Sequence, residues 1–210
     1  MTAIPPGRAA FLAVDLQRQF IDASSPFVVP GGEDLVARVV AFADRARSSG
    51  AHIVWIRQEQ RAELPSAASA RRFAQGEELN RGAMAALHPT IRPAASDTVL
   101  VKPRQSAFFA TDLDVTLRQL GVTEVLIAGV TTNVCCFATG VDAIARGYSV
   151  TMLSDLTEAL PFAGNDALPP MSNDAVRVAA LSFFAYSVGT VRNSRDVFVD
   201  EAEHVQGGTS

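Results

Sequence analysis

The chain has 210 residues, 48% of them hydrophobic, and its 18 basic and 22 acidic residues give a net charge of −4. This length suits one domain with a sizeable core. Because its basic residues are scattered and no apolar run approaches the roughly 18 residues of a membrane span, the sequence excludes a basic nucleic-acid surface and a transmembrane helix.

The first part of the chain predicts a strand, a helix and a second strand. Residues 9–14 form a short apolar run that ends at Asp15, and residues 51–57 form another. Between them a helix is predicted to begin at Glu33 and to end at Gly50. Its apolar face consists of Leu35, Val39, Phe42 and Ala46. This order is typical of a right-handed crossover between two parallel strands.

Residues 58–96 contain no strong strand pattern. We expect short helices at 67–74 and at 82–87 within this connection. Because passive connections are seldom so long, the segment is either a lid or substrate-facing excursion, or a variable surface insertion.

Four further strands are predicted in the second half. Residues 98–101, 124–128 and 148–153 form short apolar runs, and residues 189–191 begin a sixth strand. The alternation of strands and helices predicts an α/β fold, with a doubly wound, mainly parallel sheet of about six strands and helices on both faces. We expect a single domain over residues 1–210, with a core from about 9 to 192 and short flexible tails.

Helices are predicted after the third and the fifth strands of the chain. One covers residues 111–120, with Thr111 as its N-cap. The other begins near Ser172, and its inward residues are Val176, Ala179, Ala180 and Phe183. Residues 175–186 are more apolar than one inward face needs, which favours either a homodimer or homotetramer, or a helix buried on two sides within one subunit.

Cys135 lies where the fourth strand passes into a helix. Gly129 ends the strand, and Phe137, Val141 and Ile144 recur at helical spacing before Gly147. Free backbone N–H groups and the positive end of the helix dipole favour a thiolate there, and they could also receive an oxyanion. The adjacent Cys136 fits a packing role.

Polar residues follow three of the predicted buried strands. Asp15, Lys102 and Cys135 would meet at the carboxyl edge of the sheet if the first, third and fourth strands are neighbours. A carboxylate could then take the thiol proton while an ammonium pairs with both groups. Taken singly, each residue also fits an ordinary role as a turn residue, a solvated lysine or packing filler.

Three motifs resemble the isochorismatase-like cysteine hydrolases, which include nicotinamidases, N-carbamoylsarcosine amidohydrolases and ureidoacrylate amidohydrolases. They are Asp15-Leu16-Gln17-x-x-Phe20, Lys102-Pro103-Arg104-x-Ser106-Ala107-Phe108-Phe109 and Gly129-Val130-x-Thr132-Asn133-Val134-Cys135. The resemblance implies that Asp15 is the general acid/base, Lys102 the positioning cation and Cys135 the nucleophile.

The resemblance has further implications for the site and the assembly. It implies a cis peptide at Val130–Thr131 and an oxyanion hole formed by the N–H groups of Thr131 and Cys135. It implies that Phe20, Gln17 and Phe108 contact the substrate. Family members form dimers and tetramers, which favours a homo-oligomer.

Departures from the family pattern narrow the expected activity. Residues 57–60 lack the histidine of the nicotinamidase metal cluster, so we expect no metal and no cofactor. Cys135 favours amide over vinyl-ether chemistry. Gln105 and Phe137-Ala138 differ from the ureidoacrylate amidohydrolase pattern, so they argue against assigning that substrate.

The leading hypothesis is a cysteine-dependent amidohydrolase that acts on a small carboxamide, ureido or carbamoyl compound. The alternatives are an isochorismatase-type vinyl-ether hydrolase that uses Asp15 without the thiol, and a non-catalytic ligand-binding member. The N-terminus has no signal-peptide pattern, and two adjacent cysteines offer no disulfide framework, so we expect a cytoplasmic protein.

Overall fold

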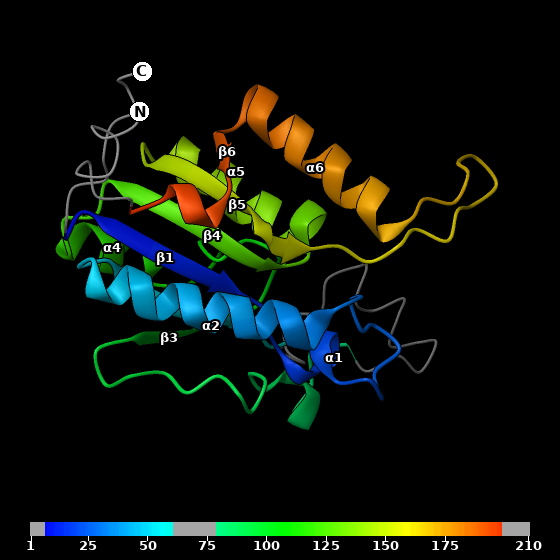
Figure 1. The fold of residues 1–210 in the computed structure, drawn as a ribbon, viewed down its shortest axis with the longest axis horizontal. Coiled ribbons are helices and arrows are strands. Elements are labelled where there is room, and N and C mark those ends of the chain that lie inside the picture. The colour runs from blue at the N-terminus through cyan, green and yellow to red at the C-terminus, as the bar shows by residue number, and fades with distance from the viewer. Residues whose placement is uncertain (1–6, 61–78, 199–210) are drawn as a thin grey trace, which may run out of the picture.

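A computed structural model describes residues 7–60 and 79–198, and within them six strands form one parallel sheet ordered β3-β2-β1-β4-β5-β6 (Figure 1). The strands are β1 Ala9–Val14, β2 His52–Gln58, β3 Thr98–Lys102, β4 Glu124–Val130, β5 Ser149–Glu158 and β6 Thr190–Arg192. The helices are α1 Arg18–Ile21, α2 Gly32–Ser48, α4 Leu113–Gln119, α5 Phe137–Ala145 and α6 Asn173–Ser187. Short turns of helix are η1 Gly82–Ala85, η2 Thr132–Cys136 and η3 Ser194–Asp196. The predicted α/β fold is confirmed.

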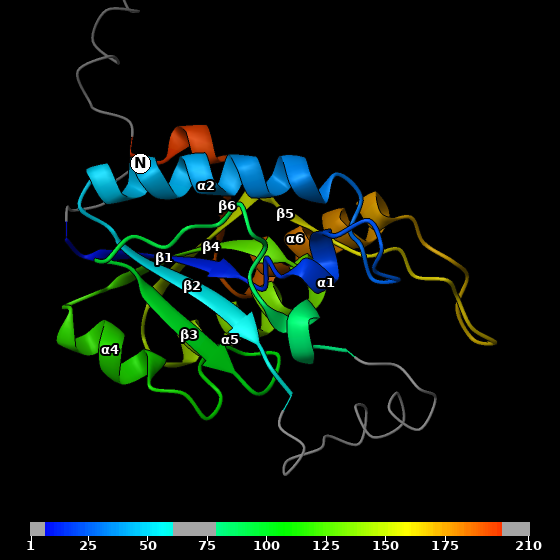
Figure 2. The same cartoon turned by 90° about the horizontal axis from the view of Figure 1, so that it is seen from below.

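Helices cover both faces of the sheet, and each face has its own apolar core. Helix α2 and η3 lie over one face and α4 and α5 over the other (Figure 2). Strand β1 is buried along its whole length, because Phe11 packs beneath α2 while Leu12 packs on the opposite side. The predicted inward residues of α2 are all buried, namely Leu35, Val39, Phe42 and Ala46.

The order of the strands differs from the expected one. Strands β1 and β4 are neighbours as expected, but β2 lies between β1 and β3. Strand β3 is therefore at the edge of the sheet, and its Val99 and Val101 side chains are 49% and 38% exposed, so it is not a buried strand. Apolar runs identify strands, but they carry no information about which strands pair.

The buried faces of α5 and α6 also differ from the sequence pattern. In α6, Val176 and Ala180 are buried as predicted, but Phe183 is 65% exposed and Phe184 is fully buried instead. In α5, Val141 and Ile144 are exposed, and Gly140 lies directly against the Phe184 ring. The close contact between α5 and α6 therefore decides which residues are buried.

Several connections were predicted only in part. The helix predicted at 67–74 lies outside the described residues, and the one at 82–87 is the short turn η1. Helix α4 begins at Leu113 and its N-cap is Asp112 in place of the predicted Thr111, although the Leu113 N–H donates to the Thr111 hydroxyl. The loop predicted between β5 and α6 projects from the body as an arm, closed by bridges of Phe162 to Met171 and Asn165 to Leu168 (Figure 1). None of the described helices is long and apolar enough to cross a membrane.

Candidate active site

Asp15 and Lys102 form a buried ion pair at the carboxyl edge of the sheet. Asp15 directly follows β1, Lys102 is the last residue of β3, and Lys102 Nζ lies 2.8 Å from Asp15 Oδ2. Both side chains are fully buried. The lysine side chain thus reaches Asp15 although β2 separates their strands. Asp15 has a φ of 52°, in the left-handed region that Asp and Asn tolerate better than most residues.

The loop after β3 wraps around the lysine ammonium. Lys102 Nζ donates to the carbonyl oxygens of Arg104 and Gln105 at 3.0 and 2.8 Å. Together with the Asp15 carboxylate, these acceptors compensate a charge that would otherwise be costly to bury. The structure therefore holds the ammonium in a fixed place.

Cys135 lies in η2, a single π-helical turn between β4 and α5. In this turn the N–H of Cys136 donates to the carbonyl of Thr131, five residues earlier, at 3.2 Å. Such turns occur often at functional sites. The peptide bond Val130–Thr131 is cis, at the position that the family resemblance implies. Cys135 is 6% exposed, and its thiol is close to Asp15 and Lys102, which both influence its pKa.

Gln58, the last residue of β2, also belongs to this group, although sequence reasoning missed it. Its Oε1 lies 3.3 Å from Lys102 Nζ and 3.7 Å from Cys135 Sγ. The predicted strand stopped at Arg57, one residue short. The rule that polar residues at strand ends gather at one edge would have identified Gln58 had the boundary been right.

Burial dominates the protonation of the site. It raises the pKa of the Cys135 thiol to about 12, against the attraction of the Lys102 ammonium. Burial therefore opposes the thiolate that the start of a helix favours, while the Lys102 ammonium supports it. Burial also raises the pKa of Asp15, with Lys102 opposing it. For Lys102 burial acts to lower the pKa, but the Asp15 charge outweighs it and the pKa is raised.

The three residues predicted to contact substrate lie in different places. The side-chain amide of Gln17 forms hydrogen bonds with the backbone of Gln58 and the carbonyl of Ala85. Gln17 therefore supports the position of Gln58 in the site. Phe20 is 7% exposed and packs in the core beneath α2. Substrate contact by Gln17 and Phe20 stays a prediction.

The Phe108 ring lies away from the other site residues. It stacks on Tyr148 at a centroid distance of 6.0 Å, with Arg146 over it at 4.9 Å. Arg146 follows the C-terminal end of α5, whereas Cys135 precedes its N-terminal end. The structure therefore places Phe108 near the C-terminal end of α5, and its contact with substrate stays a prediction.

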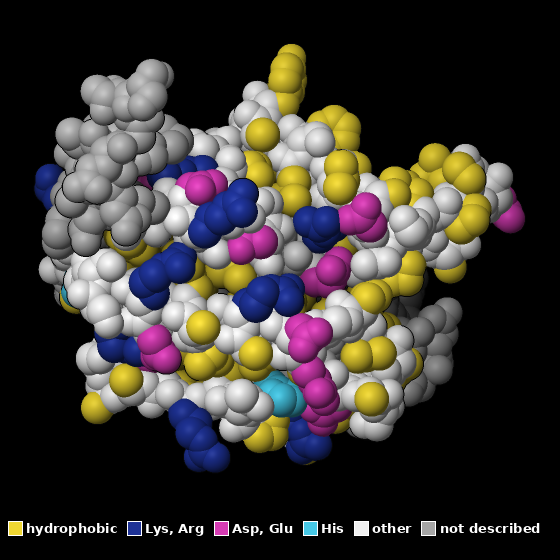
Figure 3. Space-filling model, viewed as in Figure 1, with side chains coloured by type: hydrophobic (Ala, Val, Ile, Leu, Met, Phe, Trp, Pro, Cys, Tyr) yellow, Lys and Arg dark blue, Asp and Glu magenta, His cyan; other side chains and the backbone are white. Residues whose placement is uncertain are grey.

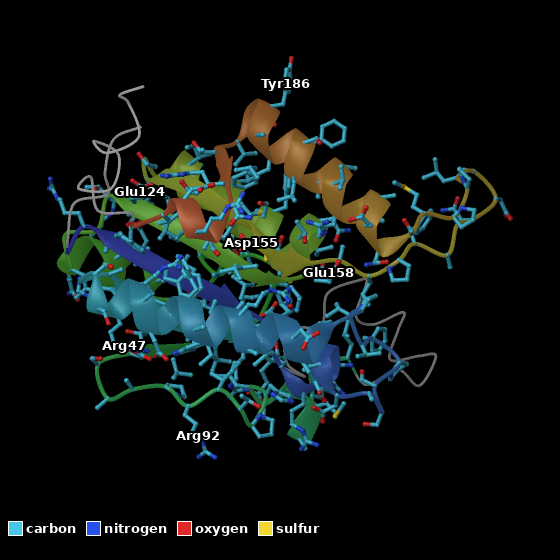
Figure 4. All side chains as sticks on the ribbon, in the orientation of Figure 1. Arg47, Arg92, Glu124, Asp155, Glu158 and Tyr186 are labelled. Carbon is cyan, nitrogen blue, oxygen red and sulfur yellow. The ribbon has the colours of Figure 1, made fainter. Side chains whose placement is uncertain are left out.

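A polar hollow elsewhere on the surface is lined in part by side chains that already pair with other groups of the protein. With a volume of about 450 Å³, it is lined by Arg38, Ser154, Asp155, Thr157, Glu158, Arg177 and Asn193. Asp155, labelled on β5 in Figure 4, accepts hydrogen bonds from the N–H and hydroxyl of Ser194, and Arg177 pairs with Asp174.

Among the described residues, no three His, Cys, Asp or Glu side chains are grouped to hold a metal ion.

Comparisons with known proteins extend over most of the chain. An isochorismatase domain model matches residues 9–175. The chain is 32% identical over 157 residues to a probable inactive nicotinamidase of Arabidopsis thaliana, which covers 71% of this chain and 80% of that protein. It is 28% identical over 177 residues to ureidoacrylate amidohydrolase RutB of Methylobacterium radiotolerans, covering 74% and 69%. A cysteine hydrolase from Pseudomonas syringae pv. phaseolicola has the same fold, with a TM-score of 0.85, 25% identity and 93% of both chains covered.

Proposed function

The chain belongs to the isochorismatase domain family of hydrolases, and on that premise we propose that it hydrolyses a C–N bond of a small carboxamide, ureido or carbamoyl compound through a covalent intermediate on Cys135. The observation that carries the proposal is the buried Asp15–Lys102 pair at 2.8 Å, beside a thiol at the start of a helix. A thiol nucleophile beside a carboxylate that can act as general acid and base suits acyl transfer through a thioester, and the ammonium keeps the carboxylate ionised.

In the first half of the proposed reaction, the Asp15 carboxylate accepts the thiol proton while sulfur attacks the carbonyl carbon. The C–N bond then breaks, and the leaving nitrogen takes the proton from Asp15. This half yields a thioester on Cys135 and ammonia or an amine. A thiol whose pKa is about 12 needs such a base. A carboxyl whose pKa is raised by burial is suited to return the proton.

In the second half, water attacks the thioester carbon and gives a proton to Asp15. The C–S bond breaks, the acid product leaves, and the proton returns to sulfur. We assign the developing oxyanion of both halves to the N–H groups of Thr131 and Cys135. The Lys102 ammonium stabilises the ionised form of Asp15 throughout.

The relatives support the reaction class without defining the substrate. The similarity to ureidoacrylate amidohydrolase RutB favours C–N bond hydrolysis. A second relative is described as probably inactive, so a non-catalytic role is a real alternative for this chain. The departures at Gln105 and Phe137 leave the acyl and leaving groups open.

The test measures ammonia release over a panel of small amides and ureido acids. Cys135→Ala should abolish release and the acyl adduct seen by mass spectrometry, while Cys136→Ala, the matched control, should retain both. Thermal unfolding of the two variants checks that each is folded. Ammonia release that persists in Cys135→Ala would overturn the proposal. Hydrolysis of isochorismate by that variant would instead favour the vinyl-ether alternative, and inertness of the wild type on both classes would favour a binding role.

A further inference from the structure

The backbone of Gln58, at the end of β2, is held by two hydrogen bonds with the side chain of Gln17. The side-chain amide of Gln17 donates to the Gln58 carbonyl at 2.9 Å and accepts from the Gln58 N–H at 2.7 Å. The same Gln17 nitrogen donates to the carbonyl of Ala85 in η1. The Gln58 backbone is therefore fixed on both sides, and its side chain starts from a defined position at the edge of the sheet.

The side-chain oxygen of Gln58 lies between the ammonium and the thiol. An ammonium has three hydrogens to donate, and Lys102 Nζ donates to Gln105, Arg104 and Gln58 Oε1 at 2.8, 3.0 and 3.3 Å, beside its ion-pair contact with Asp15. The bond to Gln58 is the longest of the three. Because a carbonyl oxygen has two lone pairs, Gln58 Oε1 can accept both from the ammonium and from the S–H group of Cys135, 3.7 Å away.

We propose that Gln58 is a positioning residue of this site, whose side-chain carbonyl accepts the S–H group of Cys135 and holds the sulfur between Asp15 and Lys102. The inference deepens the proposed function, because it concerns the same nucleophile. Gln58 makes no bond to substrate in this role. It sets the resting direction of the thiol and stabilises its protonated form until Asp15 takes the proton.

The side-chain amide of Gln58 carries no charge, and the proposed positioning of the thiol depends on this. Within residues 7–60 and 79–198, the charged and titratable groups around the thiol are Asp15 after β1, Lys102 from β3 and Cys136 from η2. One carboxylate and one ammonium balance each other, so a third charge would be buried without a partner. A glutamine accepts a hydrogen bond there without disturbing the balance, whereas a glutamate would repel both the thiolate and the Asp15 carboxylate.

The test follows alkylation of Cys135 by iodoacetamide as a function of pH, in a Cys136→Ala background so that one thiol reports. Gln58→Glu should move the midpoint of the profile to higher pH by at least about one unit, which is a tenfold slower reaction near pH 8. Gln119→Glu is the matched control, because Gln119 is exposed at the end of α4 and should give the parent profile.

Gln58→Asn provides the second variant, since it keeps the amide but withdraws its oxygen from the sulfur. Losing the acceptor should move the profile to lower pH, and kcat should fall while KM changes little. If the profiles of both Gln58 variants overlay the parent, the proposal is wrong. Alkylation needs no turnover, so this outcome is separate from that of the ammonia-release experiment, which tests the proposed function.

Discussion

In the ion pair between Asp15 and Lys102, the ammonium of Lys102 stabilises the buried negative charge of Asp15. The Asp15 carboxylate is fully buried, and Lys102 has the largest effect of the groups that oppose the effect of burial on its pKa. Breaking a buried pair by removing one partner typically costs about 3–5 kcal/mol. The pair is therefore both a catalytic feature of the proposed reaction and a point of vulnerability in the fold.

Lys102→Met should lower the free energy of unfolding by about 3–5 kcal/mol at pH 7 and by less near pH 4. Without the ammonium, the pKa of Asp15 in the folded state, already raised by burial, rises further. A raised folded-state pKa contributes stability that is fully present below the unfolded value and is lost as pH rises through the folded value. Urea unfolding at several pH values measures this dependence.

The double variant Asp15→Asn with Lys102→Met is the control for this pH dependence. It removes the carboxylate together with its partner, so the extra loss at neutral pH should disappear. A Lys102→Met protein whose deficit relative to the wild type is the same at pH 4 and pH 7 would show that the Asp15 charge is not its cause.

The sequence indicated which residues gather at the site, but it did not indicate how burial changes the pKa values of their side chains. Asp15, Lys102 and Cys135 were found because each follows a predicted strand and lies in a family motif. Gln58 escaped because the predicted strand ended one residue early and an amide suggests no chemistry by itself. The sequence does not predict how far burial raises the pKa of Cys135, because desolvation depends on how the whole edge packs, which neighbouring residues in the chain do not reveal.

At the scale of elements, the contact between β1 and β4 sets the geometry of the site. Gly129 pairs with Val14, the residue before Asp15, and has a φ of +114°. A Cβ at this position would lie 2.0 Å from the Val14 carbonyl oxygen. Only glycine lets the strands approach this closely, immediately before the segments that carry Asp15 and Cys135.

Gly129→Ala should therefore destabilise the protein by more than the roughly 1–2 kcal/mol that a left-handed conformation alone costs a non-glycine residue. It should also speed alkylation of Cys135 at neutral pH, since separating β1 from β4 moves Asp15, whose charge raises the pKa of the thiol, away from the sulfur. Chemical unfolding and iodoacetamide kinetics measure the two effects. Gly121→Ala is the control, because Gly121 has a φ of +67° but open space where the Cβ would lie. Equal losses in both variants would argue against the close-approach explanation.

Helical periodicity predicted some faces correctly and others wrongly, for a physical reason. The pattern of α2 succeeded because this helix packs on a single flat face of the sheet. The patterns of α5 and α6 failed because these helices also pack on each other, so that Gly140 and Phe184 are buried while Val141 and Phe183 are exposed. A periodic pattern marks apolar positions, but it does not identify what each of them meets.

At the scale of the whole molecule, the outer face of α6 leaves apolar side chains uncovered. Val178, Phe183 and Tyr186 are 48%, 65% and 90% exposed, and Leu168 on the arm is 58% exposed. Figure 3 shows hydrophobic side chains over α6 and along the arm, and Figure 4 shows Tyr186 pointing away from the body. A cluster of aromatic side chains in this position is typical of a surface that another protein covers.

We propose that this face joins copies of the chain into a homodimer or homotetramer. The double variant Phe183→Lys with Tyr186→Lys should shift the mass measured by light scattering toward that of a monomer, because burying two added cations in the contact is costly. Val115→Lys changes an apolar residue on α4 that is 56% exposed, and should leave the mass unchanged. Since the altered side chains lie outside the core, both proteins should unfold as cooperatively as the wild type. A wild-type chain that is monomeric over the whole accessible concentration range would contradict the proposal, and the exposed face would then need a different partner.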